Sequence, residues 1–321
     1  MKRMLLATTV LALTAPMAVA EISFSGYGRF GLNYNSDAVF NESQIDMRMR
    51  INIDGSVETD SGITFGGRIR LQYDENTVSD NDSDGLVSND RAGAQLSPAM
   101  LYATGFGVRV EVGNANTAYD SVALMYNSEI GYLDRGFGDP NGNYFSFNST
   151  PYGSEEINRM GLFVSYSAGG FNGRISLVDP DQTGAVIDEE ELSLSVDYAF
   201  GQATVAAAYV DNAAGVENAQ ALFLGAEYAI SDAANIGLLY FDYDEDLDAN
   251  DSVRVTLYGN YTMDAITFKG YVATDDQDGL ANDTAYGLGV DYDLGGARLS
   301  GDIHRSYAEE TIAGLGVRFD F

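Results

Sequence analysis

Ile22-Ser-Phe24-Ser-Gly-Tyr-Gly-Arg-Phe30-Gly-Leu32-Asn-Tyr34 alternates apolar and polar side chains with a period of two residues. This period is typical of a β-strand that has one apolar and one polar face. The same pattern recurs at 45–53, 63–73, 108–112, 192–200, 222–230, 253–257, 286–294 and 315–321. In a water-soluble β-sandwich the apolar faces would pack together, whereas in a membrane barrel they face lipid and the polar residues line the lumen.

Aromatic side chains near the end of every second strand favour the membrane barrel. They follow one another at steps of 32, 30, 33, 31 and 27 residues, and they are Tyr166, Tyr198, Tyr228, Tyr261, Tyr292 and Phe319. Each step corresponds to two strands of about ten residues with one turn and one longer loop. Aromatics at the same height on the apolar face form an interfacial girdle.

This spacing divides the chain into sixteen expected strands. They are 22–34, 43–57, 63–74, 95–104, 107–113, 158–167, 171–179, 190–199, 203–211, 220–230, 235–243, 252–262, 265–274, 284–294, 297–304 and 311–321. Lipid offers a backbone no hydrogen-bond partners, so the last strand must pair with the first. We therefore predict an all-β fold, a 16-stranded antiparallel transmembrane β-barrel.

The alternating pattern stops for over forty residues, from Asn114 to Ile157, and then resumes. Such a long irregular segment in a compact domain is usually functional. It begins with Ala118–Tyr126, which we expect to be a helix, and it contains an aromatic run, Tyr144–Phe147. We predict that this third loop, residues 114–157, folds into the lumen and narrows it.

Residues 1–20 have the pattern of a signal peptide. Lys2 and Arg3 form a charged start, residues 4–15 an apolar core, and Ala18-Val-Ala20 a cleavage site of small residues. We expect the mature chain to begin at Glu21 and to form a single exported domain, residues 21–321. Removing two cations and no acids changes the formal net charge from −31 to −33.

The composition excludes several classes of function. Strong acidity argues against a nucleic-acid partner, because phosphate binding requires clustered cations. The chain has no Cys and a single His, His304, so disulfides, thiol chemistry and most metal sites or acid–base triads are excluded. Residues 21–321 also contain no apolar run of the about eighteen residues that a spanning helix needs.

The alternation assigns the arginines of the first strands to the lumen. On the strand 43–57, Ile45 and the following odd-numbered residues face outward, so Arg48 and Arg50 face inward. The same reasoning gives six inward arginines in all: Arg29, Arg48, Arg50, Arg68, Arg70 and Arg109. Five of them lie on three adjacent strands, and we expect them to form the basic wall of a constriction.

The expected counter-charges are four carboxylates of the long loop, Asp120, Glu129, Asp134 and Asp139. Two unit charges ~4 Å apart gain about 4 kcal/mol at an effective dielectric constant near 20, so opposed rows would hold the loop in place. Charge and pore diameter together set selectivity. The alternative is that the arginines are ordinary lumen residues that pair locally.

Asp80-Asn-Asp82-Ser-Asp84-Gly85 has the opening spacing of a calcium-binding loop. Position twelve is Arg91 instead of Glu, and no helices are expected on either side, so the stretch is not an EF-hand. A weak Ca²⁺ site at Asp80, Asp82 and Asp84 is one interpretation, and a solvated acidic loop is the other. Nothing else in the sequence requires a cofactor.

Six stretches spread over the chain carry a family resemblance: 21–32, 59–62, 120–124, 257–261, 284–287 and 316–321. They resemble the general diffusion porins of purple non-sulfur (Rhodobacter-type) and related alphaproteobacteria, in which Asp120-Ser-Val-Ala-Leu124 matches the pore-narrowing third loop. The resemblance implies a homotrimer in the bacterial outer membrane, in contact with lipid and lipopolysaccharide. It also implies passive diffusion of small hydrophilic solutes and ions. Small outward residues would let barrels pack closely, such as Gly26, Gly28, Gly66-Gly67, Ala94 and Pro98.

Two other functions are compatible with a barrel. A solute-specific channel would use aromatic residues along the lumen, and Tyr144–Phe147 leaves this open. A barrel hydrolase needs a histidine within reach of Ser or Asp. His304 has Asp302 and Ser306 nearby, but the sequence has no Gly-x-Ser-x-Gly elbow. We therefore expect a channel and not an enzyme.

Overall fold

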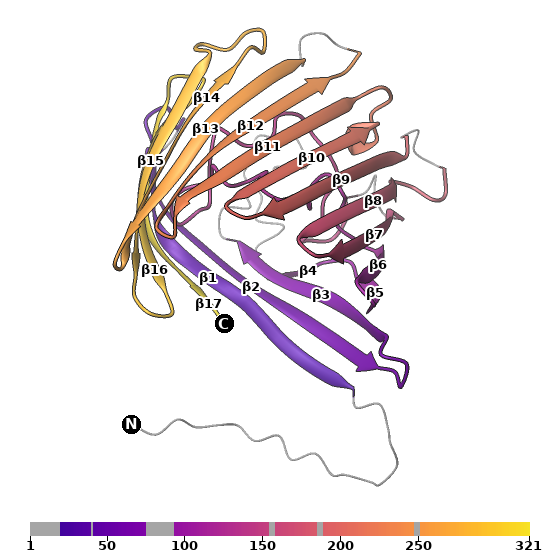
Figure 1. Ribbon diagram of the computed structural model, residues 1–321. Helices are drawn as coiled ribbons and strands as arrows, with labels where there is room; N and C mark the ends of the chain where they lie inside the picture. Colours follow the sequence, from indigo (N-terminus) through magenta and orange to yellow (C-terminus); the bar gives the residue numbers. More distant parts are fainter. Residues whose placement is uncertain (1–19, 40, 75–92, 154–157, 185–188, 247–250) are drawn as a thin grey trace, which may run out of the picture.

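The expected strands are present and run antiparallel around a ring (Figure 1). The computed structural model describes residues 20–321 except 40, 75–92, 154–157, 185–188 and 247–250. The described strands are β1 (Glu21–Asn35), β2 (Ser43–Glu58), β3 (Thr64–Asp74), β4 (Gln95–Leu96), β5 (Met100–Gly105), β6 (Val108–Gly113), β7 (Met160–Ala168), β8 (Phe171–Asp179), β9 (Glu191–Phe200), β10 (Ala203–Asp211), β11 (Gln220–Ser231), β12 (Ala234–Asp244), β13 (Ser252–Met263), β14 (Ile266–Asp275), β15 (Thr284–Asp293), β16 (Arg298–Arg305) and β17 (Thr311–Asp320). A 3-10 turn, η1 (Ala213–Gly215), follows β10.

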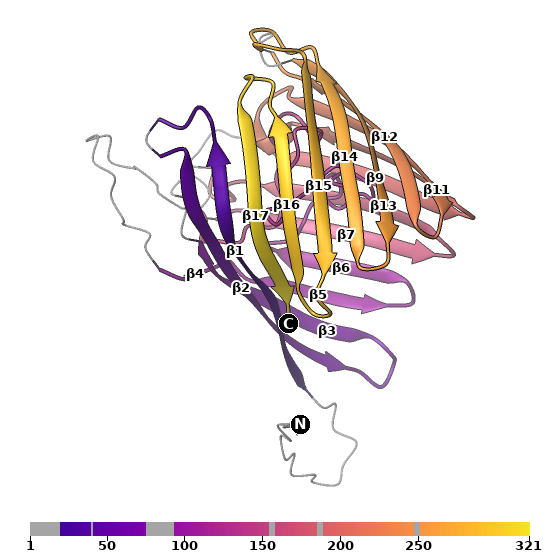
Figure 2. The same cartoon turned by 90° about the vertical axis from the view of Figure 1, so that its left-hand side faces the viewer.

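The sheet closes because the last strand pairs with the first. β17 runs beside β1 from Asp320 opposite Tyr27 to Ile312 opposite Asn35, and Figure 2 shows it between β1 and β16. Beyond this ladder, Gly26 and Phe321 exchange two backbone hydrogen bonds. Closure removes the sheet edge, so the strand backbones find their partners without water.

One expected strand, 95–104, is divided into β4 and β5. Pro98 lies at the break, and proline has no N–H to donate to the ladder. The neighbouring Ser97 compensates, because its hydroxyl accepts the N–H of Arg70 at 2.8 Å and its own N–H donates to the Arg70 carbonyl at 2.8 Å. Since β4 and β5 both pair with β3, they occupy one strand position in the ring, and the barrel has the predicted sixteen strands.

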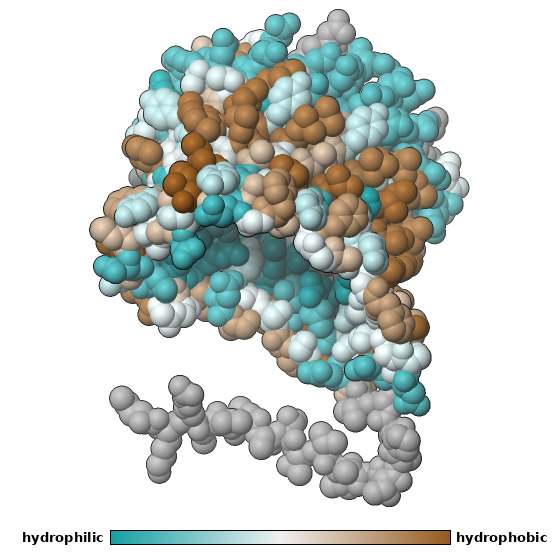
Figure 3. All heavy atoms as spheres, in the orientation of Figure 1, coloured by the Kyte–Doolittle hydropathy of each residue, from teal (hydrophilic) through white to brown (hydrophobic). Residues whose placement is uncertain are grey.

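The outer face of the barrel is apolar. Ile22 and Phe24 on β1 are 69% and 66% exposed, and Ile45 on β2 is 69% exposed. The six aromatics of the expected girdle are all exposed as well. Figure 3 shows hydrophobic side chains over the outside and a hollow with hydrophilic walls. Apolar faces that point away from one another fit a membrane barrel and not a sandwich.

Residues 114–153, between β6 and β7, form turns and one isolated bridge, between Ile130 and Arg135. The prediction of a helix at Ala118–Tyr126 is wrong. Single turns form there, such as Ser121 N–H to the Thr117 carbonyl at 3.1 Å. Leu124, however, has a φ of 72°, which a right-handed helix does not accommodate.

Large side chains of this segment pack against small residues on the inner face, the face opposite the exposed apolar side chains. Tyr119, Met125 and Tyr132 are all 0% exposed. A Cβ added at Gly225 on β11 would meet Leu124, one at Gly289 on β15 would meet Ile130, and one at Gly316 on β17 would meet Tyr132. The strands β11–β17 therefore provide space that the segment fills.

Candidate functional site

Five of the six arginines expected to face inward lie side by side on β1, β2 and β3. Arg29 is opposite Arg48 in the β1–β2 ladder. In the β2–β3 ladder, Arg50 is opposite Gln72 and Arg70 is opposite Asn52. Ladder positions and alternation together place these five arginines (29, 48, 50, 68, 70) on the inner face, and Arg109 lies further round the ring on β6. We call the five the basic wall.

The ion pairs of the basic wall are made between neighbouring strands. Arg48 Nε donates to Asp74 Oδ2 at 2.6 Å, and Arg68 Nε to Asp54 Oδ1 at 2.8 Å. Arg29 on β1 pairs with Asp46 on β2 at 3.7 Å, whereas Arg109, which lies outside the basic wall, pairs with Glu111 on its own strand β6 at 2.6 Å. This differs from the expected pairing with the long loop and matches the local alternative. Strand pairing already holds these acids close, so no additional chain must be ordered.

The basic wall touches the segment through neutral groups. Arg70 Nη1 donates to Ser149 Oγ at 2.7 Å, and its guanidinium lies 4.3 Å from the centre of the Phe147 ring. Arg29 Nη1 donates to the Leu133 carbonyl at 3.0 Å. These contacts orient the guanidiniums without neutralising them, so the wall keeps positive charge that a passing ion can sense.

Asp134, one of the four expected loop carboxylates, binds two arginines that the sequence analysis missed. Arg298 on β16 donates to Asp134 Oδ1 at 2.7 Å, and Arg318 on β17 pairs with its other oxygen. The signal was present in the alternation, because Leu299 and Phe319 face outward and their neighbours must face inward. Ring closure then places Arg318 opposite Arg29.

Two other expected carboxylates are held within the segment. Asp120 accepts the Tyr126 hydroxyl at 2.5 Å, and burial raises the pKa of its carboxyl. Asp139 accepts the Ser128 hydroxyl at 2.7 Å. Burial raises the pKa of Asp139 to about 7, although the Ser128 hydrogen bond opposes the shift. Neither carboxylate lies against the basic wall.

Glu129 is the fourth expected carboxylate, and both burial and neighbouring charges shift its pKa. Burial, and then the charge of Asp139, raise its pKa to about 8, whereas the positive charges of Arg318, Lys269 and Arg29 oppose this rise. Burial is therefore the largest influence on its ionisation, and charges of the segment and of the strands modify it. A group with such a pKa changes charge near neutral pH.

The environment of His304 does not fit a hydrolase. Its Nε2 lies 2.9 Å from Asp302 Oδ2 and its Nδ1 lies 2.9 Å from the Tyr271 hydroxyl, and the side chain is 2% exposed. The Ser306 hydroxyl is engaged by the Glu310 N–H at 3.0 Å. A buried imidazole with both nitrogens occupied links strands and does not meet a substrate.

The calcium interpretation concerns Asp80, Asp82 and Asp84, which lie outside the described residues. Within the described ranges, no group of three or more His, Cys, Asp or Glu side chains is placed to hold a metal ion. The Ca²⁺ site therefore stays a prediction.

Comparisons with known proteins agree with this architecture. The family model of Gram-negative porins matches residues 7–308. The protein named Porin from Fuscovulum blasticum is 42% identical over 306 residues, covering 94% of this chain and 100% of that protein. The Porin of Rhodobacter capsulatus is 31% identical over 332 residues, with coverages of 94% and 100%.

Solved structures of related proteins share the fold. A mutant of Rh. blastica porin has a TM-score of 0.84 at 41% identity, covering 94% of this chain and 100% of that chain. A triple mutant of Rhodopseudomonas blastica porin has a TM-score of 0.83 at 40% identity, with the same coverages. The predicted resemblance and barrel fold are thus confirmed, and membership of a porin family implies a channel rather than an enzyme. The chain belongs to the Gram-negative porin family.

Proposed function

We propose that the protein forms a water-filled channel through the outer membrane, through which small hydrophilic solutes and ions diffuse passively. The observation that carries this proposal is the contrast between the two faces of a closed barrel. The outer face exposes residues such as Ile22 and Phe24, whereas the inner face carries ion pairs such as Arg48–Asp74 and Arg174–Asp197. Water can fill a lumen of this kind while lipid covers the outside.

In this proposal residues 114–157 fold into the lumen and set the aperture. The described part of the segment hydrogen-bonds to inner-face side chains of several strands. The Ala118 N–H donates to Ser176 Oγ on β8 at 2.8 Å, and Thr256 Oγ1 on β13 donates to the Gly138 carbonyl at 2.9 Å. Arg135 pairs with Asp302 on β16 at 2.9 Å. The free passage would then lie between the segment and the basic wall.

The packing of the aromatic run favours an unspecific channel over a solute-specific one. Tyr144 bonds to the Tyr126 hydroxyl at 2.6 Å, and Phe145 lies under the guanidinium of Arg159, 4.1 Å from its ring centre. Phe147 is covered in the same way by Arg70. Aromatic rings that are stacked within the protein offer little open surface for a sugar to slide along.

A cleaved signal peptide at residues 1–20 and a homotrimer complete the proposal. The trimer would use outward small residues on the first strands, where lipopolysaccharide and lipid otherwise cover the barrel. Gly67 fits this role, since a Cβ there would meet the exposed Leu101. Gly66 does not, because a Cβ there would meet Tyr102, whose ring stacks under the inward Arg109 at 3.9 Å.

Planar bilayers and liposomes test the channel. Current should rise in proportion to KCl concentration, and swelling rates should fall steadily with the size of uncharged solutes without saturating. Saturation by a single solute would indicate a specific channel instead, and an absence of conductance from inserted protein would overturn the proposal.

A further inference from the structure

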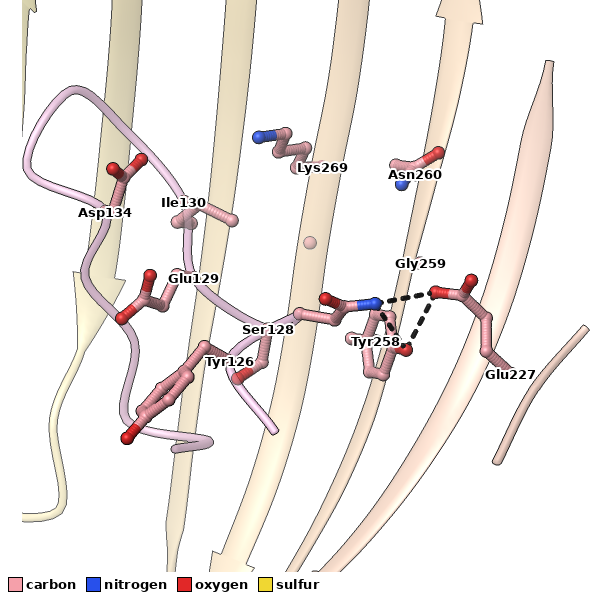
Figure 4. Close-up of a pocket in the computed structure, with 12 residues that line it drawn as sticks. Tyr126, Ser128, Glu129, Ile130, Asp134, Glu227, Tyr258, Gly259, Asn260 and Lys269 are labelled. Carbon is pink, nitrogen blue, oxygen red and sulfur yellow. Dashed lines mark hydrogen bonds between the residues drawn. The ribbon is translucent and has the colours of Figure 1, made fainter. Parts of the chain in front are cut away.

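A polar cavity lies between the segment and strands β11, β13 and β14 (Figure 4). Its volume is about 290 Å³, which corresponds to about ten water molecules of ~30 Å³ each. Glu129 and Asp134 line it from the segment, and Glu227, Asn260 and Lys269 line it from the strands. The space is large enough for a small organic solute.

Charges of both signs face this cavity. Glu227 is fixed by two neighbours in the cavity wall, because its Oε2 accepts the Tyr258 hydroxyl at 2.8 Å and Asn127 Nδ2 at 3.1 Å. Lys269 is the single lysine of residues 21–321. Its Nζ lies 2.9 Å from Asp291 Oδ2, and an ammonium group has two further N–H donors to offer.

The Glu129 carboxylate is available to a ligand. It makes no hydrogen bond or ion pair with the residues that the structure describes. A positive group placed beside this half-buried carboxyl would favour its ionised form and gain from the attraction. The cavity thus has one side chain that lacks a cationic partner and one that has donors to spare.

An ion of one sign fits this cavity poorly. Lys269 would repel a cation, and Glu227 would repel an anion. The charge of Asp134 has little effect on a cation or an anion in the cavity, because Arg298 and Arg318 already pair with it. A molecule that carries an ammonium group and a carboxylate a few ångströms apart matches both signs at once.

We propose that this cavity binds zwitterionic solutes of the size of a small amino acid. The ammonium group of the solute would lie against Glu129 and Glu227, and its carboxylate would accept hydrogen bonds from Lys269 and Asn260. The inference rests on the proposed channel, because the solute must reach the cavity from the lumen. The site would bind amino acids briefly during their passage, and it would not bind uncharged molecules of equal size.

Single-channel current at pH 8 tests this site with three probes on the wild type. Alanine should reduce the KCl current in a saturable manner, whereas lactamide, which is uncharged and of similar size, should not. Isopropylammonium is charged at pH 8 and lacks the carboxylate, so it should act more weakly than alanine. Equal effects of alanine and lactamide, or of alanine and isopropylammonium, would overturn the proposal.

Variants then assign the effect to the cavity. Glu129→Gln and Lys269→Met should each raise the half-blocking alanine concentration roughly tenfold, which corresponds to about 1.4 kcal/mol. Glu58→Gln, at the exposed end of β2, is the matched control and should behave as the wild type. Block that persists in both variants, with β-sheet circular dichroism unchanged, would also overturn the site. If the wild type gave no KCl current at all, the channel itself would be refuted; normal KCl current without an alanine effect would refute the site alone.

Discussion

The inner faces of two parts of the barrel differ in the chemistry of their side chains. On β1–β3 the inner face carries charged residues such as Arg48, Arg50 and Arg70, each with a partner on a neighbouring strand or on the segment. On β8–β17 the inner face beneath the segment combines small residues, such as Gly289 and Gly316, with aromatic ones that are buried against the segment, such as Phe223, Phe241 and Tyr271. The segment packs on the second part and only touches the first.

This difference shows what directs the segment. Glycines on β15 and β17 leave space into which Ile130 and Tyr132 fit. A buried aromatic ring stabilises a fold more by packing than an exposed ion pair does. The charges of Asp134 and Arg135 then fasten the segment to β16 and β17. In the proposed channel, close packing on these strands, more than attraction between charged rows, would therefore set which side of the lumen stays open.

Filling one of these spaces should have the largest effect. A Cβ at Gly314 would lie 2.5 Å from Asp302 Oδ1 and 3.1 Å from Tyr132 Cε1, so Gly314→Val should push the segment towards the basic wall. We expect single-channel conductance to fall by roughly half, because pore diameter limits the ion flux. Gly55→Val is the control, since a Cβ there meets nothing within 4 Å. Equal conductance of the two variants would mean that packing does not hold the segment.

Removing charge from the open side should have a smaller effect. Arg48→Ala/Arg50→Ala takes away two positive charges and leaves Asp74 without its arginine. A unit charge ~10 Å from a passing ion contributes about 0.4 kcal/mol in water, and salt screens it further, so the cation-to-anion permeability ratio should rise roughly threefold. Reversal potentials in a KCl gradient measure this ratio. Arg305→Ala, at the end of β16, should leave it unchanged, and a shift towards chloride would contradict the role of the wall.

The inner face of β1–β3 could be predicted from the sequence. Alternation on each strand is local, so it predicted that Arg29, Arg48 and Arg50 face inward before any pairing was known. The spacing of the aromatics predicted the number of strands, and the division of one expected strand coincides with Pro98. These features depend on residues that are neighbours in the chain.

The packing of the segment on β8–β17 could not be predicted in the same way. The path of the segment depends on glycines as distant as Gly225 and Gly316, which form one surface only after the barrel closes. Closure also brings Arg318 beside Arg29, so the partners of Asp134 come from the far end of the chain. The positive φ of Leu124 is incompatible with the helix that the local pattern favoured.

The smallest effect concerns the charge of Glu129, which the segment presents to the polar cavity beside β11, β13 and β14. Burial raises the pKa of Glu129 to about 8, above the usual value of a carboxyl group, so this side chain is neutral at pH 6 and ionised at pH 9. The cation-to-anion permeability ratio should therefore rise between these pH values. The rise should be roughly twofold or less, because ionisation adds one negative charge, whereas Arg48→Ala/Arg50→Ala removes two positive charges. Glu129→Gln should flatten the dependence, and Glu58→Gln should retain it. A ratio that falls with rising pH would place Glu129 away from the ions, and the open side would then owe its selectivity to the basic wall alone.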